Sequence, residues 1–235
     1  YSIPFYSFLG YVLFVIVLIK ISGDSKFDKV LLNKRINDVT AINPIQVNKV
    51  IQPRSTDEII KAIKSTTGPI SIGGGRYSMG GQIGFENSLH IDMRQFNKVL
   101  SLDLDKKQVT IQPGITWRDL QEVIDPSNLS IKIMQTYANF TVGGSISVNC
   151  HGRYIGHGPI ISSVLNLKIT TADGNIVVAN RTENTEIFNA AIGGYGGIGV
   201  IVEATLQLVD NVKVERQTKK VDINDYNKFF SENIR

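Results

Sequence analysis

The sequence has 235 residues, of which 42% are hydrophobic and 20% charged, and this globular composition excludes global disorder. The net charge is only +4 and the basic residues form no stripe with interleaved aromatic residues, so a nucleic-acid partner is not expected. The one cysteine, Cys150, permits no internal disulfide and is interpreted as a small buried residue. No Cys/His spacing typical of a zinc site occurs, and no metal is expected.

Residues 3–19 form an uncharged and almost wholly apolar run that ends at Lys20. As a helix rising about 1.5 Å per residue, the run would be roughly 25 Å long, close to the thickness of a bilayer core. The sequence therefore predicts a single-pass transmembrane or signal-anchor helix over 1–22, attached to the membrane through 3–19. A cleaved signal peptide and a buried core helix are the alternatives. The basic residues that follow favour a cytoplasmic location for the rest of the chain.

A polar linker is expected over 23–44, and a folded domain begins near residue 45. Ser55 followed by Glu58 is a capping-box pattern that predicts the start of a helix, which a Gly-Pro pair ends. A short strand over 70–72 then runs directly into three consecutive glycines. This region is therefore predicted to be a small β-α-β unit that ends in a glycine loop.

The rest of the chain predicts hairpins and short helices. Strands are expected over 89–92, 99–104, 108–112, 164–170, 175–179, 199–208 and 212–221. Helices are expected over 116–124, 141–147, 186–192 and 224–234. Turn signals at 105–107 and 172–174 connect neighbouring strands into hairpins. One β-α-β unit followed by antiparallel hairpins predicts an α+β domain of two packed subdomains, not a doubly wound parallel sheet.

Glycine is the compositional outlier, because 16 of the 21 glycines fall in the stretches 73–84, 143–158 and 193–199. A glycine loop presents successive backbone N–H groups with no Cβ in the way, which suits phosphate binding. A tight turn that serves only the fold is the alternative for each cluster. Three clusters flanked by Ser, Thr, Gln or Asn favour loops that converge on one long anionic cofactor.

Two phosphate-binding motifs can be tested against the glycine clusters. The P-loop pattern G-x-x-x-x-G-K-[ST] does not occur. The segment 194–199 matches G-x-G-x-x-G, but a predicted helix precedes it and a predicted strand follows it. The dinucleotide fingerprint has the opposite order, so this match is not interpreted as a Rossmann motif.

The segments 70–82, 141–152 and 189–201 together resemble the PCMH-type FAD-binding domain of the vanillyl-alcohol oxidase/p-cresol methylhydroxylase superfamily. The resemblance covers 45–210 and implies a fold of two α+β subdomains with FAD between them. It implies that 211–235 begin a substrate or cap domain, and that most catalytic residues follow residue 235. The implied activity is that of an FAD-dependent oxidoreductase in which hydride passes from a substrate carbon to flavin N5.

The resemblance also implies which residues bind FAD. The first glycine loop would wrap the pyrophosphate, the second would line the pyrophosphate and the flavin, a His-Gly step would lie near the isoalloxazine, and the last two residues would contact the adenine part. The implied residues are Gly73, Gly74, Gly75, Arg76, Tyr77, Ser78, Gln82, Thr136, Thr141, Gly143, Gly144, Ser147, His151, Gly152, Val200 and Ile201.

Many members of the superfamily bond FAD covalently through a histidine in the first loop, where this sequence has Tyr77. A second covalent link in some members needs a cysteine where this sequence has Asn139. Noncovalent FAD is therefore expected, with a tyrosyl ether as the alternative. His90 is interpreted as a half-buried structural histidine, whereas His157 lies in a loop that could face the active site. No histidine is assigned as a catalytic base.

The expected function is that of a membrane-anchored FAD-dependent oxidoreductase acting on a small-molecule alcohol, sugar or lactone. One alternative is a membrane-associated flavin reductase or oxidase acting on an isoprenoid-linked sugar or a sterol, which would suit the predicted anchor. Another alternative, from a different class, is a flavin-binding protein without chemistry of its own.

Overall fold

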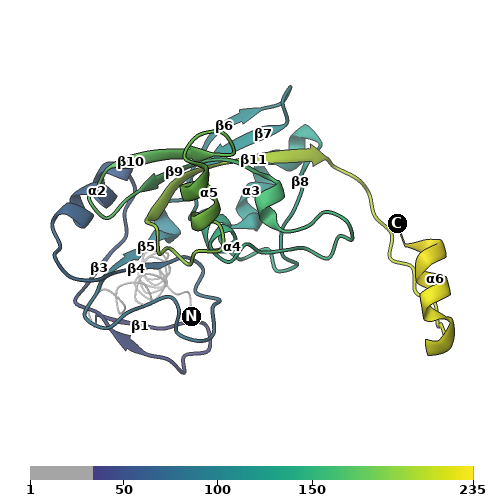
Figure 1. Ribbon diagram of the computed structural model, residues 1–235, viewed down its shortest axis with the longest axis horizontal. Helices are drawn as coiled ribbons and strands as arrows, with labels where there is room; N and C mark the ends of the chain where they lie inside the picture. Colours follow the sequence, from purple (N-terminus) through teal and green to yellow (C-terminus); the bar gives the residue numbers. More distant parts are fainter. Residues whose placement is uncertain (1–33, 235) are drawn as a thin grey trace, which may run out of the picture.

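The computed structural model describes residues 34–234, so the predicted helix over 1–22 lies outside the described residues. No helix in the described part is long and apolar enough to span a bilayer. Figure 1 shows a body built from sheets and short helices, with helix α6 standing apart at the end of an extended connection. The mixed architecture confirms the expectation of an α+β domain.

The smaller of the two main sheets is parallel and has the strand order β3-β5-β4. Strand β3 (Lys49–Ile51), helix α2 (Thr56–Lys64) and strand β4 (Ile70–Gly73) form the predicted β-α-β unit. Strand β5 (Leu89–Asp92) inserts between β3 and β4 and pairs with both in parallel. The sequence predicted this strand but not its position, because its two partners are distant in sequence.

Helix α2 begins where the capping pattern predicted. The Ser55 side chain accepts a hydrogen bond from the N–H of Glu58, and the Glu58 carboxylate accepts one from the N–H of Arg54. Both sides of the capping box are therefore formed, with the carboxylate reaching one residue beyond the usual N-cap N–H. The helix buries Ile59 and Ile63 against the parallel sheet.

The larger sheet is antiparallel and has the strand order β10-β9-β11-β7-β6, with β8 pairing to the end of β11. Both predicted hairpins are confirmed, since β6 pairs with β7 and β9 with β10. The short strand β8 was not predicted. The bounds are β6 (Val99–Asp103), β7 (Gln108–Ile111), β8 (Leu129–Ile131), β9 (Val164–Thr170), β10 (Ile176–Asn180) and β11 (Val200–Asp210).

Helices α3 (Trp117–Ile124), α4 (Val142–Ser147) and α5 (Thr185–Ala191) gather on one side of the larger sheet in Figure 1. Their apolar side chains join those of the sheet in the larger of two hydrophobic cores, which includes the fully buried Trp117. The helices expected from residues 116 and 141 are present, and Thr116 caps α3 while Thr141 caps α4. Single 3-10 turns lie at Met93–Gln95, Asp125–Ser127, Ile160–Ser162 and Ile223–Asp225.

Strand β11 contributes to both hydrophobic cores. Val200 and Val202 pack in the smaller core, whereas Ile201 and Ala204 pack in the larger one. The register against β9 shifts between Ile201 and Glu203. The extra residue at such a bulge shifts the alternation of the side chains between the two faces of the strand. One continuous strand can therefore contribute side chains to both cores.

Two parts of the chain differ from the predicted pattern. Strand β1 (Arg35–Ile36) lies within the range assigned to a linker and pairs with β2 (Ile45–Gln46) just after that range, and Ile36 is fully buried. The predicted strand over 212–221 is wrong, because this stretch is extended and exposed without a partner strand. An apolar/polar alternation alone does not make a strand when no neighbouring strand accepts its hydrogen bonds. Helix α6 (Tyr226–Asn233) follows and buries no residue.

Candidate cofactor site

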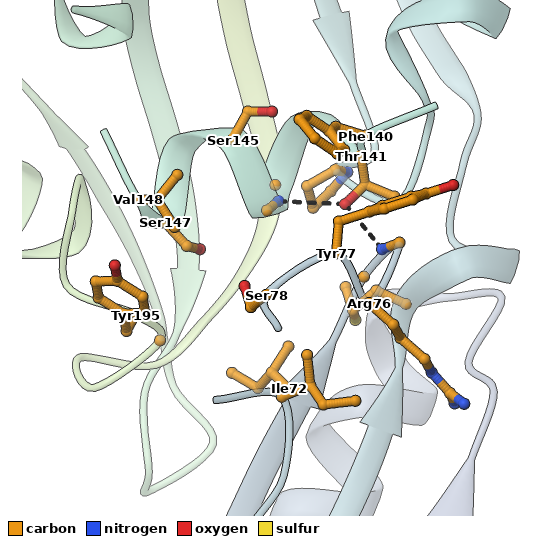
Figure 2. Close-up of a pocket in the computed structure, with 18 of the residues that line it drawn as sticks. Ile72, Arg76, Tyr77, Ser78, Phe140, Thr141, Ser145, Ser147, Val148 and Tyr195 are labelled. Atoms are coloured by element: carbon orange, nitrogen blue, oxygen red, sulfur yellow. Dashed lines mark hydrogen bonds between the residues drawn. The ribbon is translucent and has the colours of Figure 1, made fainter. Parts of the chain in front are cut away.

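A cavity of about 300 Å³ lies where the two main sheets meet. Its wall comes from β4 and the loop that follows it, from α4, from the third glycine cluster and from β11. Figure 2 shows Ile72, Ser78, Thr141, Ser147 and Tyr195 surrounding this space from separate elements. All three glycine clusters therefore supply part of one wall, as the sequence predicted for loops converging on one ligand.

Eleven of the sixteen predicted site residues line the cavity. They are Gly74, Gly75, Arg76, Tyr77, Ser78, Gln82, Thr141, Gly143, Gly144, Ser147 and Ile201.

Five predicted residues do not line the cavity: Gly73, Thr136, His151, Gly152 and Val200. Val200 packs in the smaller core instead. His151 is exposed, and its Nδ1 lies 2.9 Å from the Gly152 carbonyl oxygen. The loop that carries both residues also carries His157, which is exposed and stacks edge-on against Tyr154. No histidine therefore lies at the cavity wall among the described residues.

The Thr141 hydroxyl joins the first glycine loop to the second. Its oxygen accepts hydrogen bonds from the N–H groups of Gly75 and Gly144, at 3.4 and 3.3 Å, drawn as dashed lines in Figure 2. A Cβ on Gly74 would overlap this oxygen, so the close approach of the two loops requires glycine there.

The third glycine cluster closes against the same two elements. The Tyr195 N–H donates to the Ser147 carbonyl oxygen of α4 at 3.0 Å. Gly196 has a φ of +79°, and a Cβ there would lie 3.0 Å from the Ile72 side chain of β4. The cluster follows helix α5 and precedes strand β11, which confirms that its G-x-G-x-x-G match is not a Rossmann motif.

The first loop presents backbone donors that the protein itself does not use. The N–H groups of Arg76, Tyr77 and Ser78 make no hydrogen bond to any described residue, and all three residues line the cavity. Arg76 has a φ of +64°, the left-handed conformation that turns successive N–H groups in one direction. Such consecutive unpaired donors suit an anionic group such as a phosphate.

The Arg76 side chain extends away from the cavity, as Figure 2 shows, and pairs with Asp92 at 3.1 Å. The fully buried Asp92 carboxylate also pairs with Arg94 at 2.6 Å and accepts a hydrogen bond from Gln52. Burial raises the pKa of Asp92, but Arg94, Arg76 and Gln52 together hold that pKa below its ordinary value. The guanidinium of Arg76 therefore anchors the loop on the side away from the cavity, and the loop itself lines the cavity.

His90 lies beside this ion-pair group. It is fully buried, whereas the sequence predicted a half-buried histidine, so the predicted extent of burial was wrong. A hydrogen bond of 2.9 Å joins its Nδ1 to the Ser71 hydroxyl, which in turn lies 2.7 Å from the Ser88 hydroxyl. Burial and the charge of Arg76 lower the pKa of His90 to about 4. The imidazole is therefore neutral and structural at neutral pH.

Tyr77 stands in an aromatic group at the cavity wall. Its ring centre lies 5.2 Å from that of Tyr137 and 4.9 Å from that of Phe140, in edge-on and tilted contacts. Interaction with the Tyr137 hydroxyl and partial burial raise the pKa of the Tyr77 phenol. The phenol is therefore protonated at neutral pH.

The sequence analysis did not predict several residues that line the cavity. Tyr195, Gly196 and Gly199 lie inside the third glycine cluster and could have been found from it. Ser145 lies inside the second glycine cluster and could have been found from it as well, whereas Gln135 belongs to no motif and only the packing of the chain brings it to the cavity. The remaining ones are Ile72, Ile83, Met93, Pro113, Phe140 and Val148.

The described residues contain no group of His, Cys, Asp or Glu side chains that could hold a metal ion. The single cysteine, Cys150, is buried as predicted, and burial raises the pKa of its thiol to about 11. Neither a metal centre nor a reactive thiol is therefore present in residues 34–234.

Comparison with known proteins identifies relatives among flavoenzymes. The chain is 31% identical over 170 residues to L-gulonolactone oxidase of Bos taurus, covering 71% of this chain and 38% of that protein. It is 33% identical over 127 residues to mitochondrial L-galactono-1,4-lactone dehydrogenase of Arabidopsis thaliana, covering 54% of this chain and 21% of that protein. It is 26% identical over 187 residues to cytokinin dehydrogenase 2 of Arabidopsis thaliana, covering 77% of this chain and 37% of that protein. The chain thus spans well under half the length of each of these relatives.

The model of the FAD binding domain family matches residues 47–180, which is more than half of the chain. The match contains the first two glycine loops and ends at the last residue of β10. It confirms the resemblance of segments 70–82 and 141–152 to the PCMH-type FAD-binding domain. The chain therefore belongs to the FAD binding domain family.

Proposed function

We propose that this chain is the FAD-binding part of an FAD-dependent oxidoreductase that oxidises a sugar lactone or a related alcohol. The observation that carries the proposal is the cavity in which three glycine loops meet and three consecutive N–H groups remain unpaired. When bound, FAD would supply the hydride acceptor at flavin N5. Family membership and the lactone-oxidising relatives support the same function.

The residues of this chain would bind and orient the cofactor. The N–H groups of Arg76, Tyr77 and Ser78 would hold the pyrophosphate, because the three residues line the cavity and these groups have no acceptor among the described residues. The Thr141 hydroxyl would keep the first loop and α4 at a fixed separation. Ile201 and Val148 would exclude water from the apolar part of the cavity.

Noncovalent attachment is part of the proposal. Tyr77 occupies the loop position where a linking histidine would stand, and its protonated phenol is a weak nucleophile. Its ring is also packed between Tyr137 and Phe140. Acid precipitation of FAD-loaded protein should leave the flavin in the supernatant, whereas a yellow pellet would refute this part.

A titration with FAD tests the binding premise. The full chain, freed of flavin and titrated with FAD, should change the flavin absorption spectrum with a saturable dissociation constant. Absence of any saturable change would overturn the proposal. Anaerobic addition of aldonolactones to the FAD-loaded full-length protein should then bleach the visible absorption band of the flavin, whereas a passive flavin carrier would show no bleaching.

Membrane attachment through 3–19 belongs to the proposal as well, with the rest of the chain on the cytoplasmic side. It is supported only by the charge-free apolar run and by the basic residues after it. Sedimentation of the expressed chain with membranes, and its release to the supernatant when residues 1–22 are deleted, would be the expected result. A chain that stays in the supernatant with these residues present would contradict it.

A further inference from the structure

Gln135 lines the cavity and belongs to a hydrogen-bond chain that starts in the core. The indole N–H of Trp117 donates to the Ser145 hydroxyl at 2.9 Å and, more weakly, to the Gln135 amide oxygen at 3.4 Å. The Ser145 hydroxyl donates to the same amide oxygen at 2.5 Å. Trp117 and Ser145 are 0% and 1% exposed, so these donors approach Gln135 from the buried side.

This arrangement fixes which end of the amide is the oxygen. An indole N–H can only donate, and it occupies the Ser145 oxygen as donor, which leaves the hydroxyl proton for Gln135. A reversed amide would place its NH2 group against two donors. The oxygen therefore faces Trp117 and Ser145, and the NH2 group lies on the other side of the amide carbon.

The NH2 group of Gln135 makes no hydrogen bond to any described residue. Its nitrogen is not one of the fully buried side-chain atoms that lack a partner among the described residues, so it keeps some accessible surface. The residue lines the cavity and its amide oxygen is engaged by two buried donors, so the NH2 group is the part of the amide that remains available to a ligand there. A donor that is held rigidly by two buried groups and left unpaired at a cavity wall is suited to an acceptor on a ligand.

We infer that Gln135 is a cofactor-positioning residue whose NH2 group donates a hydrogen bond to an acceptor oxygen or nitrogen of bound FAD. The inference rests on the proposed function and deepens it, because it assigns a side-chain contact where the other expected contacts come mainly from backbone. Trp117 and Ser145 act through Gln135, since they hold its amide in one orientation. None of the three residues was predicted from the sequence.

The variant Gln135→Glu separates a ligand contact from a structural role. Its carboxylate can still accept from Trp117 and Ser145, so the buried half of the network is kept. Only the atom that faces the cavity changes, from a donor to an acceptor. The full chain carrying this change should unfold in urea at the wild-type midpoint without FAD, yet bind FAD at least tenfold more weakly.

Two further variants complete the test. Gln135→Met removes the donor without adding charge and should also weaken FAD binding at least tenfold, measured on protein shown to be folded by circular dichroism. Gln121→Glu introduces the same charge on α3 away from the cavity and should bind FAD as the wild type does. Wild-type affinity in Gln135→Glu, or in Gln135→Met alone, would overturn the inference. Failure of wild-type protein to bind FAD would instead overturn the proposed function.

Discussion

Asp92 illustrates how single buried residues set the shape of the first glycine loop. Its side chain is fully buried and is held by Arg76, Arg94 and Gln52. Arg76 is part of the loop, so the carboxylate connects the loop to strand β5 and to the 3-10 turn after it. This connection fixes the position of the loop whose residues line the cavity.

Replacing Asp92 with asparagine should therefore destabilise the fold. The change removes the carboxylate that pairs with the buried Arg76 guanidinium, and breaking one side of a buried ion pair costs about 3 kcal/mol or more. Urea unfolding should show a large fall in midpoint. The matched change Asp210→Asn removes the partner of Lys107 in an exposed pair and should leave the midpoint unchanged. Equal effects in the two variants would contradict the role assigned to Asp92.

His90 gives the fold a dependence on pH. Its pKa is about 4 in the folded protein against an unfolded value of 6.5, so protonation favours the unfolded chain. Stability should be lost as pH falls from 6.5 towards 4, with about 2 kcal/mol less at pH 5 than at pH 7. The Asp92 carboxylate contributes in a lower window, because a depressed pKa stabilises above about pH 4 and the contribution is lost below it.

Urea unfolding at pH 7 and pH 5 measures the contribution of His90. His90→Gln should reduce the difference between the two pH values, since glutamine does not titrate. His151→Gln removes an exposed histidine and should keep the wild-type difference. The same pH dependence in His90→Gln as in the wild type would show that another group is responsible.

At the scale of elements, helices α3 and α4 both begin at a threonine N-cap, but the two threonine hydroxyls accept different sets of hydrogen bonds. The hydroxyl of Thr116 accepts only from the N–H of Asp119, which is its own helix cap. The hydroxyl of Thr141 caps α4 and also accepts from Gly75 of the first loop. The sequence predicts both helices, whereas the contact between Thr141 and the first loop follows from the tertiary structure.

The two caps offer a matched pair of variants. Thr116→Val and Thr141→Val should each lower stability by about 1 kcal/mol, because each removes an N-cap acceptor. Only Thr141→Val should also weaken FAD binding, by about tenfold, since it releases the first loop from α4. Thr141→Ser keeps the hydroxyl and should restore affinity. A similar loss of FAD affinity in Thr116→Val would contradict a specific role for Thr141.

At the scale of the whole molecule, strand β11 unites the two subdomains. It lies in the middle of the larger sheet, and the bulge after Ile201 allows Val200 and Val202 to pack in the smaller core while Ala204 packs in the larger one. Both cores should therefore unfold together in one cooperative transition. Ile201 also lines the cavity, so the element that couples the two cores contributes to the site between them.

The segment after β11 lies outside this cooperative unit. Residues 212–234 form an extended connection and helix α6, which buries no residue and stands apart from the body in Figure 1. A chain ending at residue 211 should unfold within about 0.5 kcal/mol of the longer chain, because little apolar surface is removed from contact. Urea unfolding compares the two chains, and a marked loss of stability would show that the segment packs on the body.

The sequence predicted most local structure, because caps, turns and short apolar runs are encoded by neighbouring residues. Ser55, Thr116 and Thr141 each mark a real helix start, and the two hairpins have the predicted turns. The predicted strand over 212–221 is wrong because a strand depends on partners that its own residues do not specify. The same limit explains why β8 and the β1–β2 pair were not predicted.

The candidate site divides in the same way. Glycine clusters and their flanking threonine and serine residues predict, from sequence alone, that three loops come together, and all three line one cavity, because glycine allows close backbone approach. Only the tertiary structure decided that Arg76 turns away to Asp92, that His151 lies outside the cavity, and that Gln135 lies at its wall. The physical reason is that the direction of a side chain depends on partners far away in sequence, whereas the freedom of a glycine backbone belongs to the residue itself.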